Sequence, residues 1–350
     1  MANQKDQQSY QRKDAHLDLA KTPLAKAQIS HPFDTIQLTH HALPDGAINK
    51  VQTTTLFCGK QLSVPFFIGA MTGGTKRADA INHALAEVAQ DKQIALALGS
   101  QRAGLSRGLS QKSLRRIAPD AVLIGNLGIT QLAAKEGQDM ALRAIDDIEA
   151  NAMAIHLNPL QEAAQIEGDH DWSGTRKALT TFLASCPVPV IIKEVGAGIN
   201  AELAAELTAM GAAYIDIAGL GGTNWTRIET ARHDTQNQTA FAPFLDWGID
   251  TATAIQTARA AMPDGAIIAS GGIRHGLDVA KALALGADLV CAAGPFLAAL
   301  EDDNGTLSQQ ALASCLDEWT YQLNLACFLT NCRHSRDLSQ KSRPYVTDFR

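Results

Sequence analysis

The chain has 350 residues, of which 46% are hydrophobic and 19% are charged, and its formal net charge is −6. This composition is typical of a large folded core and disfavours a disordered chain. A mildly acidic protein has no basic field with which to grip nucleic acid, so we expect no nucleic-acid partner. The length fits two average domains or a single α/β barrel.

The cysteines and the N-terminus indicate the compartment. The six cysteines form no C-x-x-C pair, which favours reduced thiols in a cytoplasmic protein. Residues 1–13 are rich in Gln and Lys and lack the apolar core of a secretory signal. No apolar run approaches the roughly 20 residues that span a bilayer, so we expect no membrane partner.

Residues 1–63 precede the first strand of the predicted barrel, and we interpret them as an N-terminal extension. Within it, residues 53–62 are typical of a β-hairpin that turns near Gly59. We expect this hairpin to plug the N-terminal mouth of a barrel domain formed by residues 64–350, which ends in C-terminal helices.

From residue 64 onward, short apolar runs alternate with Ala-rich amphipathic stretches, as in repeated βα units. The predicted strands are 65–70, 94–98, 122–126, 152–157, 188–195, 213–218, 266–270 and 289–293. Helices with apolar residues at i, i+3 and i+4 are predicted over 77–91, 173–185, 200–210, 251–262 and 276–285. The sequence therefore predicts an α/β fold, a (β/α)8 TIM barrel of about eight strands.

The predicted strand 152–157 ends in the most informative segment of the chain. Pro159 cannot donate to a neighbouring strand, so Gln161 and Glu162 begin the next loop. Ligands of parallel α/β folds gather at this end of the strands, which favours a functional role. The alternative is an ordinary helix entrance, where Pro-x-Gln-Glu is common.

The connection after the sixth predicted strand, residues 220–248, is unusually long and polar. It carries Trp225, Arg227, Glu229 and Trp247. Long loops in compact domains are usually lids or contact surfaces, so we predict a lid that becomes ordered when ligand binds.

Glycine-rich turns follow the last two predicted strands. Ser270-Gly271-Gly272-Ile273-Arg274 and Ala293-Gly294 each lead into a helix. Bare glycine backbone lets N–H groups approach a phosphate, and barrels often hold phosphate after strands seven and eight. We predict a phosphate site here; ordinary turns are the alternative.

Lys193 ends the apolar run 190–193, where an unpaired ammonium would be strongly disfavoured. Glu194 should point to the opposite face of the sheet, which leaves a bound ligand as the expected counter-ion. The alternative is a lysine that reaches solvent from the strand end.

Six motifs in order along the chain carry a resemblance to a known family. They are RKDAH at 12–16, GAMTGG at 69–74, GSQR at 99–102, HLNPLQE at 156–162, GGTNW at 221–225 and SGGIR at 270–274. Together they resemble the type 2 isopentenyl-diphosphate isomerases over nearly the whole chain. That family consists of FMN-dependent barrels that interconvert isopentenyl and dimethylallyl diphosphate with no net redox change.

The resemblance implies cofactors, an assembly and site residues. It implies reduced FMN, Mg²⁺, NADPH as the reductant, and a homotetramer or octamer. Implied FMN contacts are Ala70, Met71, Thr72, Ser100, Asn126, Lys193, Thr223, Gly271, Gly272, Arg274, Ala293 and Gly294. Implied substrate contacts are Arg12, Lys13, His16, Ser100, Gln101, Arg102 and Gln161, and Glu162 is the implied metal ligand. For Arg12, Lys13 and His16, a surface charge cluster is the alternative.

The expected chemistry moves a proton onto an alkene and removes another. We expect the N5 region of reduced flavin to be the principal acid and base, with Gln161 at the alkene. Lys193 would stabilise the anionic reduced flavin. His156 is a third catalytic candidate, and its alternative is a core histidine bonded to backbone.

One residue departs from the family pattern, and other functions remain open. Ala218 stands where the family usually has serine, so we expect weaker FMN retention. A 2-hydroxy-acid oxidase would need a histidine in the loop 219–225, and an inosinate-type dehydrogenase a cysteine; this loop has neither. A non-enzymatic flavin-binding module leaves Gln161 and Glu162 unexplained.

Overall fold

A closed barrel of parallel strands forms the centre of the molecule. The structure, a computed structural model, describes residues 18, 19, 22, 25, 26, 28–71, 73–233, 235–341, 345 and 346. The barrel order is β10-β11-β4-β5-β6-β7-β8-β9. The strands are β4 (Phe66–Ile68), β5 (Ala95–Ala97), β6 (Val122–Gly128), β7 (Ala152–His156), β8 (Val190–Lys193), β9 (Tyr214–Asp216), β10 (Ile267–Ala269) and β11 (Leu289–Ala292). The predicted TIM barrel is confirmed.

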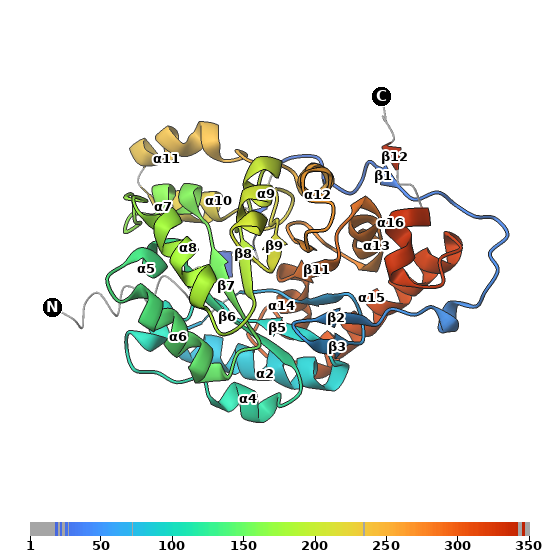
Figure 1. Cartoon of the computed structure of the whole chain (residues 1–350), viewed down its shortest axis with the longest axis horizontal. Coiled ribbons are helices and arrows are strands. Elements are labelled where there is room, and N and C mark those ends of the chain that lie inside the picture. The colour runs from blue at the N-terminus through green and yellow to red at the C-terminus, as the bar shows by residue number, and fades with distance from the viewer. Residues whose placement is uncertain are drawn as a thin grey trace.

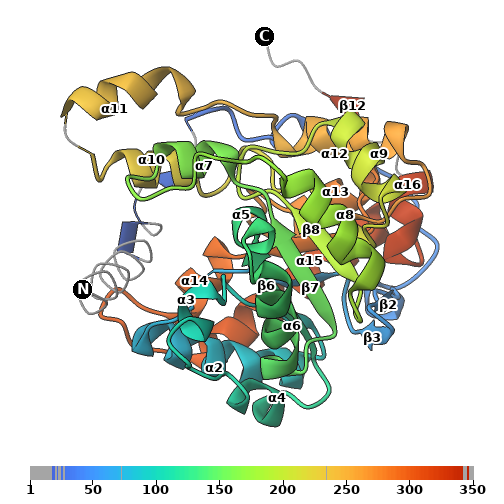
Figure 2. The same cartoon turned by 60° about the vertical axis from the view of Figure 1, so that its left-hand side comes forward.

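Helices surround the strands on the outside of the barrel (Figure 1; Figure 2). The longer ones are α2 (Lys76–Lys92), α6 (Gly137–Ile148), α8 (Thr175–Ser185), α9 (Ala201–Ala209), α12 (Thr251–Ala261), α13 (Gly276–Leu285) and α15 (Gln309–Leu329). The shorter ones are α3 (Arg102–Leu105), α4 (Ser113–Ile117), α5 (Ile129–Ala133), α7 (Pro159–Ala164), α10 (Trp225–Thr230), α11 (Thr235–Phe241), α14 (Gly294–Leu300) and α16 (Leu338–Lys341). The five helices predicted with bounds are present, and α15 is one of the C-terminal helices predicted without bounds, whereas α6 was not predicted.

The barrel interior is filled at its N-terminal end. Phe67, Val122 and Ile191 belong to one interior cluster, and Phe57 and Leu62 join it from the hairpin β2 (Thr55–Phe57) and β3 (Lys60–Leu62). Cys58 and Gly59 both have positive φ, as a tight two-residue turn requires. The hairpin therefore closes this mouth, and the carboxyl ends of the strands are left for ligands.

The N-terminal extension runs along the outside of the barrel. Phe33 is fully buried, and its carbonyl oxygen accepts a 2.7 Å hydrogen bond from the ammonium of Lys281. Further along, β1 (Ile36–Gln37) pairs with β12 (Tyr345–Val346). The extension thus packs against the barrel and against the end of the chain.

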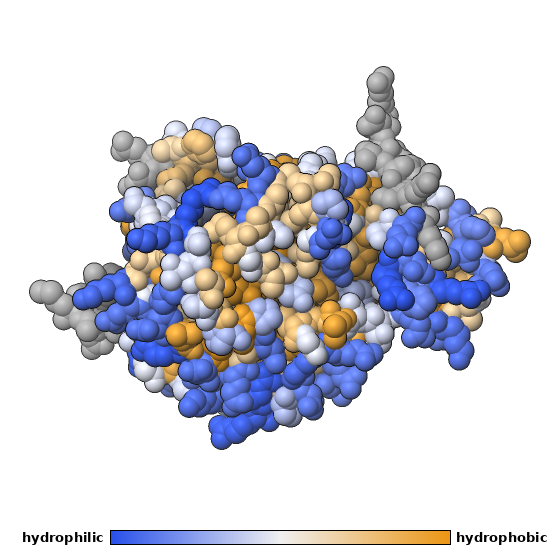
Figure 3. Space-filling model, viewed as in Figure 1, coloured by the Kyte–Doolittle hydropathy of each residue, from blue (hydrophilic) through white to orange (hydrophobic). Residues whose placement is uncertain are grey.

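One edge of the molecular surface is hydrophilic. Figure 3 shows hydrophilic residues along the lower edge of the molecule, where Figure 1 places α2 and α4. Among the described residues, no helix is both long enough and apolar enough to cross a membrane.

Candidate active site

Polar side chains line the carboxyl ends of three adjacent barrel strands. His156, Lys193 and Asp216 are the last residues of β7, β8 and β9, and they are in register: His156 pairs with Lys193, and Lys193 with Asp216. Residues in register on parallel strands point to the same face. The structure therefore gathers an imidazole, an ammonium and a carboxylate at one level of the barrel.

Asn126 and His156 form a hydrogen-bonded pair beside this layer. His156 Nδ1 lies 2.8 Å from Asn126 Oδ1, and Asn126 Nδ2 donates to the carbonyl oxygen of Leu98 at 2.9 Å. Gln101, a predicted substrate contact, is 3% exposed; its amide donates to Ala144 O and accepts from Asn126 N. Its polar atoms thus orient Asn126 within the protein.

Asp216 is a carboxylate neighbour of Lys193 that the sequence did not reveal. The sequence left a bound ligand as the expected partner, but the fully buried carboxylate of Asp216 lies in register with Lys193 on the next strand. Burial raises the pKa of Asp216, while the ammonium of Lys193 and the hydroxyl of Ser270 act in the opposite direction. Ser270 Oγ donates to Asp216 Oδ1 at 2.5 Å. The Lys193 ammonium itself donates to the carbonyl oxygen of Glu194, and a bound ligand as its counter-ion stays a prediction.

Glu194 follows β8 and bonds to the turn that comes directly after it. Its Oε2 accepts the backbone N–H groups of residues 195–198 at 2.5 to 3.2 Å. Burial raises the pKa of Glu194, and these N–H groups oppose that rise. The carboxylate therefore fixes the turn after β8, whose Val195 and Gly196 line a small pocket next to Gln161.

The proline-started helix α7 presents Gln161 and Glu162. Asn158, 4% exposed, donates its amide to Gln161 Oε1 and to Glu162 Oε1, both at 3.1 Å. Glu162 Oε2 accepts the backbone N–H of Asp169 at 2.8 Å. Asn158 Oδ1 is buried without a hydrogen-bond partner, so a polar atom remains for a ligand beside these two residues.

Glu229 is a site residue whose role the sequence did not predict. Gln161 Nε2 donates to Glu229 Oε1 at 3.3 Å, and the Glu229 side chain is fully buried on α10. The pocket beside this pair is lined by Leu160, Trp225 and Trp247 among others. A carboxylate in the long polar loop was visible in the sequence, but nothing placed it against α7.

The glycine-rich turns after β9 and β10 pack against each other. Gly271 and Gly272 have φ of 96° and 81°, and a Cβ on Gly271 would overlap the carbonyl oxygen of Gly219. Gly294, which begins α14, has no atom within 4 Å of where a Cβ would be. The backbone at Gly271 is closely packed, and the space beside Gly294 is open. Bare backbone next to open space suits a phosphate, so the residues present fit FMN.

Arg274 is already engaged by carboxylates. Its Nε donates to Asp278 Oδ2 at 2.9 Å, and one NH2 donates to Asp34 Oδ1 at 2.7 Å. Asp34 belongs to the N-terminal extension, which therefore reaches the predicted phosphate cradle. The two carboxylates compete with a phosphate for this guanidinium.

Some of the remaining predicted residues lie at the carboxyl ends of the strands, and others lie outside the described part of the chain. Ala70 and Met71 follow β4, Ser100 and Arg102 follow β5, Thr223 follows β9, and Ala293 follows β11. All lie at the same end of the barrel. Arg12, Lys13, His16 and Thr72 lie outside the described residues. Over the part of the chain that is described, no group of three or more His, Cys, Asp or Glu side chains could hold a metal ion.

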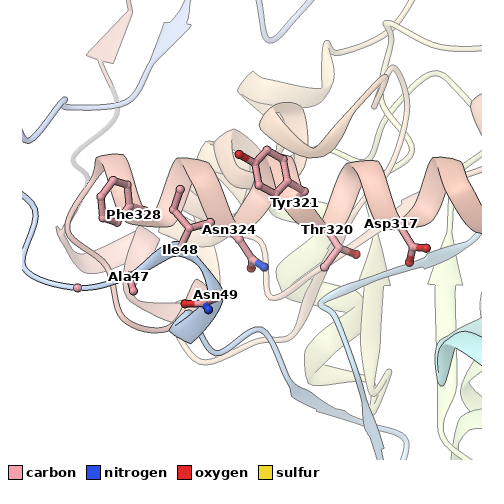
Figure 4. A pocket seen from close by; sticks show the side chains of 9 residues that line it. Ala47, Ile48, Asn49, Asp317, Thr320, Tyr321, Asn324 and Phe328 are labelled. Carbon is pink, nitrogen blue, oxygen red and sulfur yellow. The ribbon is translucent and has the colours of Figure 1, made fainter.

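A further hollow lies away from these residues. It has a volume of about 540 Å³ and is lined by residues of α15 and of the 3-10 helix η2 (Ile48–Lys50), including Tyr321, Asn324 and Ile48 (Figure 4). It contains none of the polar residues at the strand ends. The volume of a hollow is therefore no guide to the candidate site described above.

Ala218, the departure from the family pattern, has a φ of +41° and is buried directly after β9. Replacing it with serine adds a hydroxyl near the cradle without changing backbone strain. We expect Ala218→Ser to lower the FMN dissociation constant by about fivefold, the effect of one added hydrogen bond. Titration of apoprotein with FMN measures it, and an unchanged constant would contradict the expectation.

Comparisons with known proteins agree with this geometry. Residues 157–343 match the family model for FMN-dependent dehydrogenases. The chain is 43% identical over 98% of its length to isopentenyl-diphosphate delta-isomerase of Pseudescherichia vulneris, covering 99% of that protein. It is 45% identical over 94% to the isomerase of Stutzerimonas stutzeri (strain A1501), covering 94% of it.

The structural neighbours are more distant. A chimera of (S)-mandelate dehydrogenase has a TM-score of 0.69 and 18% identity, covering 96% of this chain and 99% of that one. A mandelate oxidase mutant has a TM-score of 0.64 at 17% identity, covering 96% of this chain and 97% of the other. At these identities the likeness shows the barrel fold alone. From the relatives and the family model together, the chain belongs to the FMN-dependent isopentenyl-diphosphate delta-isomerase family.

Proposed function

We propose that this enzyme interconverts isopentenyl and dimethylallyl diphosphate by protonation and deprotonation, with no net redox change. The observation that carries the proposal is the hydrogen bond between Gln161 and the buried Glu229 at the barrel mouth. A neutral amide is a poor acid, but a carboxyl group next to it can accept or supply a proton. The pair therefore offers proton transfer where an alkene would lie.

Apolar side chains lie beside this pair. Leu160, Trp225 and Trp247 line the small pocket there, and Trp225 opens α10 next to the Gln161–Glu229 pair. Apolar walls exclude the water that would trap a cation-like intermediate, and aromatic faces stabilise positive charge. We assign these side chains to the prenyl group.

The strand-end residues would hold reduced FMN above the barrel. Gly271, Gly272 and Gly294 would hold its phosphate, and Asn126 and Lys193 its ring. When bound, reduced FMN supplies an electron-rich ring that stabilises positive charge and can take part in proton transfer. The Asp216 carboxylate lies in register with Lys193 on the neighbouring strand, and the Lys193 ammonium donates to the carbonyl oxygen of Glu194.

The diphosphate needs cationic partners. Arg102 follows β5 at the same end of the barrel, and we propose Arg12, Lys13 and His16 as further partners, with Ser100 assisting. His156, held by Asn126, would face the flavin or the substrate. We also propose NADPH as the reductant, a cytoplasmic location and a homotetramer.

Glu162 is the proposed magnesium ligand, supplemented by diphosphate oxygens and water. We expect Glu162→Gln to raise the Mg²⁺ concentration for half-maximal activity by about tenfold or more, because a carboxylate ligand is lost. Activity measured against Mg²⁺ concentration gives this value. Glu167→Gln, which removes a more exposed carboxylate nearby, is the matched control and should leave the curve in place. Identical curves for Glu162→Gln and the unmodified enzyme would contradict the assignment.

Anaerobic turnover tests the proposed reaction. The purified enzyme is reduced chemically, mixed with a large molar excess of isopentenyl diphosphate, and followed by flavin absorbance and product analysis. Many molecules of dimethylallyl diphosphate per flavin, with the flavin still reduced at the end, are expected. Product formation limited to one equivalent per reduced flavin would reject an isomerase without net redox change.

A further inference from the structure

The guanidinium of Arg232 joins two loops at the edge of the active site. It donates to Glu229 Oε2 at 2.6 Å and to Glu167 Oε1 at 3.1 Å. Arg232 comes just after α10, whereas Glu167 comes just after α7, the helix that carries Gln161. One side chain therefore connects the two segments that meet at the Gln161–Glu229 hydrogen bond.

The two oxygens of Glu229 are used differently. Oε1 accepts from the Gln161 amide, and Oε2 accepts from Arg232. The Glu229 side chain is fully buried, and a buried carboxylate stays ionised only with charge-assisted hydrogen bonds. Burial by itself lowers the pKa of Arg232. The bonded carboxylates of Glu229 and Glu167 outweigh this effect and raise its pKa above the ordinary value.

The neighbouring charged groups have other partners in the described part of the chain. Arg227 pairs with Asp246 at 2.6 Å, and Glu162 accepts from Asn158 and from the backbone of Asp169. The ring of His233 lies 2.5 Å from the carbonyl oxygen of Ala164, which is a second link between the two loops. Arg232 is thus the cation whose geometry bears directly on Glu229.

We infer that Arg232 is a positioning residue that keeps Glu229 ionised and directs its Oε1 at Gln161. This inference rests on the proposed role of the Gln161–Glu229 pair. The guanidinium of Arg232 donates to the carboxylates of Glu229 and Glu167, so we assign its effect to Glu229 and not to the substrate. Its loss should therefore change turnover and its pH dependence, and leave substrate and FMN binding intact.

The test uses the full-length enzyme with reduced FMN, four single variants and one double variant. Arg232→Gln removes the positive charge. Arg232→Lys keeps the charge but lacks the two terminal nitrogens with which the guanidinium bonds both carboxylates. Glu167→Gln removes the outer carboxylate and serves as matched control, and Glu229→Gln is examined alone and combined with Arg232→Gln. For each, kcat and KM are measured across the neutral pH range, together with FMN affinity and the thermal midpoint.

We expect Arg232→Gln to lower kcat by about 10²-fold, the usual contribution of a positioned acid or base, with KM within about twofold. Its pH profile should shift because Glu229 holds a proton to higher pH without its cation. Arg232→Lys should recover part of the loss, and Glu167→Gln should stay within about twofold of the unmodified enzyme. In the Glu229→Gln background, Arg232→Gln should cause no further loss.

Other outcomes overturn the inference. A normal kcat and pH profile in Arg232→Gln, or a further loss in the Glu229→Gln background, would show that Arg232 does not act through Glu229. If Arg232→Gln fails to fold, the Arg232→Lys pH profile decides, and an unchanged profile with unchanged kcat rejects the inference. Normal turnover by Glu229→Gln alone would instead reject the proposed role of the pair, so the two failures are distinguishable.

Discussion

Gln161→Ala is expected to lower the rate of isomerisation by about 10²- to 10⁴-fold while FMN still binds, because the amide that connects the alkene site to Glu229 is removed. The structure gives the physical reason. Gln161 donates to Glu229 and accepts from Asn158, so its amide has one orientation with respect to the barrel mouth. Alanine leaves Glu229 buried without that donor, and water enters in place of the amide.

The measurement is the steady-state rate with reduced FMN, with FMN affinity measured in parallel. Gln161→Glu is the companion variant. It preserves size but places two carboxyl groups side by side, so it should restore activity only at low pH, where the pair shares a proton. Wild-type turnover by Gln161→Ala, or by Gln161→Glu at neutral pH, would show that the amide is not part of the reaction.

Gly271→Ala is expected to abolish FMN binding and to destabilise the fold. A residue with a side chain at a φ of 96° is strained by about 1–3 kcal/mol, and the added Cβ would also overlap the carbonyl oxygen of Gly219. The turns after β9 and β10 would have to separate. Thermal unfolding of the apoprotein and titration with FMN measure the two effects.

Gly294→Ala distinguishes an effect on FMN binding from an effect on the stability of the fold. Nothing in the protein lies within 4 Å of a Cβ at this position, so the thermal midpoint of the apoprotein should hardly change. The methyl group would nevertheless occupy space that we assign to the phosphate, and we expect weaker FMN binding. If Gly294→Ala binds FMN as tightly as the unmodified protein, the phosphate does not lie against Gly294.

Much of the barrel could be predicted because its signals are local. Buried parallel strands are short apolar runs, and all eight runs predicted from the sequence coincide with barrel strands. C-terminal helices were predicted without bounds, and α15 is one of them, with an apolar stripe of Leu312, Leu316, Trp319 and Leu323. The helix α6 was not predicted.

The site was predictable only where one segment carries it. The position of Gln161 and Glu162 in a loop could be predicted because Pro159 ends the strand before them. The glycine-rich turns could be predicted from their own composition. The neighbourhoods of Asp216 with Lys193 and of Glu229 with Gln161 arise between segments, and pairing across a sheet or between loops leaves no mark on either segment alone. For the same reason, the sequence did not reveal that Asp34 reaches Arg274.

Deuterium exchange in Glu229→Gln tests most directly whether protons move at the Gln161–Glu229 pair. Isopentenyl diphosphate is incubated in D₂O with the reduced enzyme, and deuterium is measured in substrate and product. We predict that the unmodified enzyme introduces deuterium into both, and that Glu229→Gln, with FMN bound and reduced, introduces it into neither at a comparable rate. Exchange by Glu229→Gln at the rate of the unmodified enzyme would contradict the assignment of proton transfer to this pair.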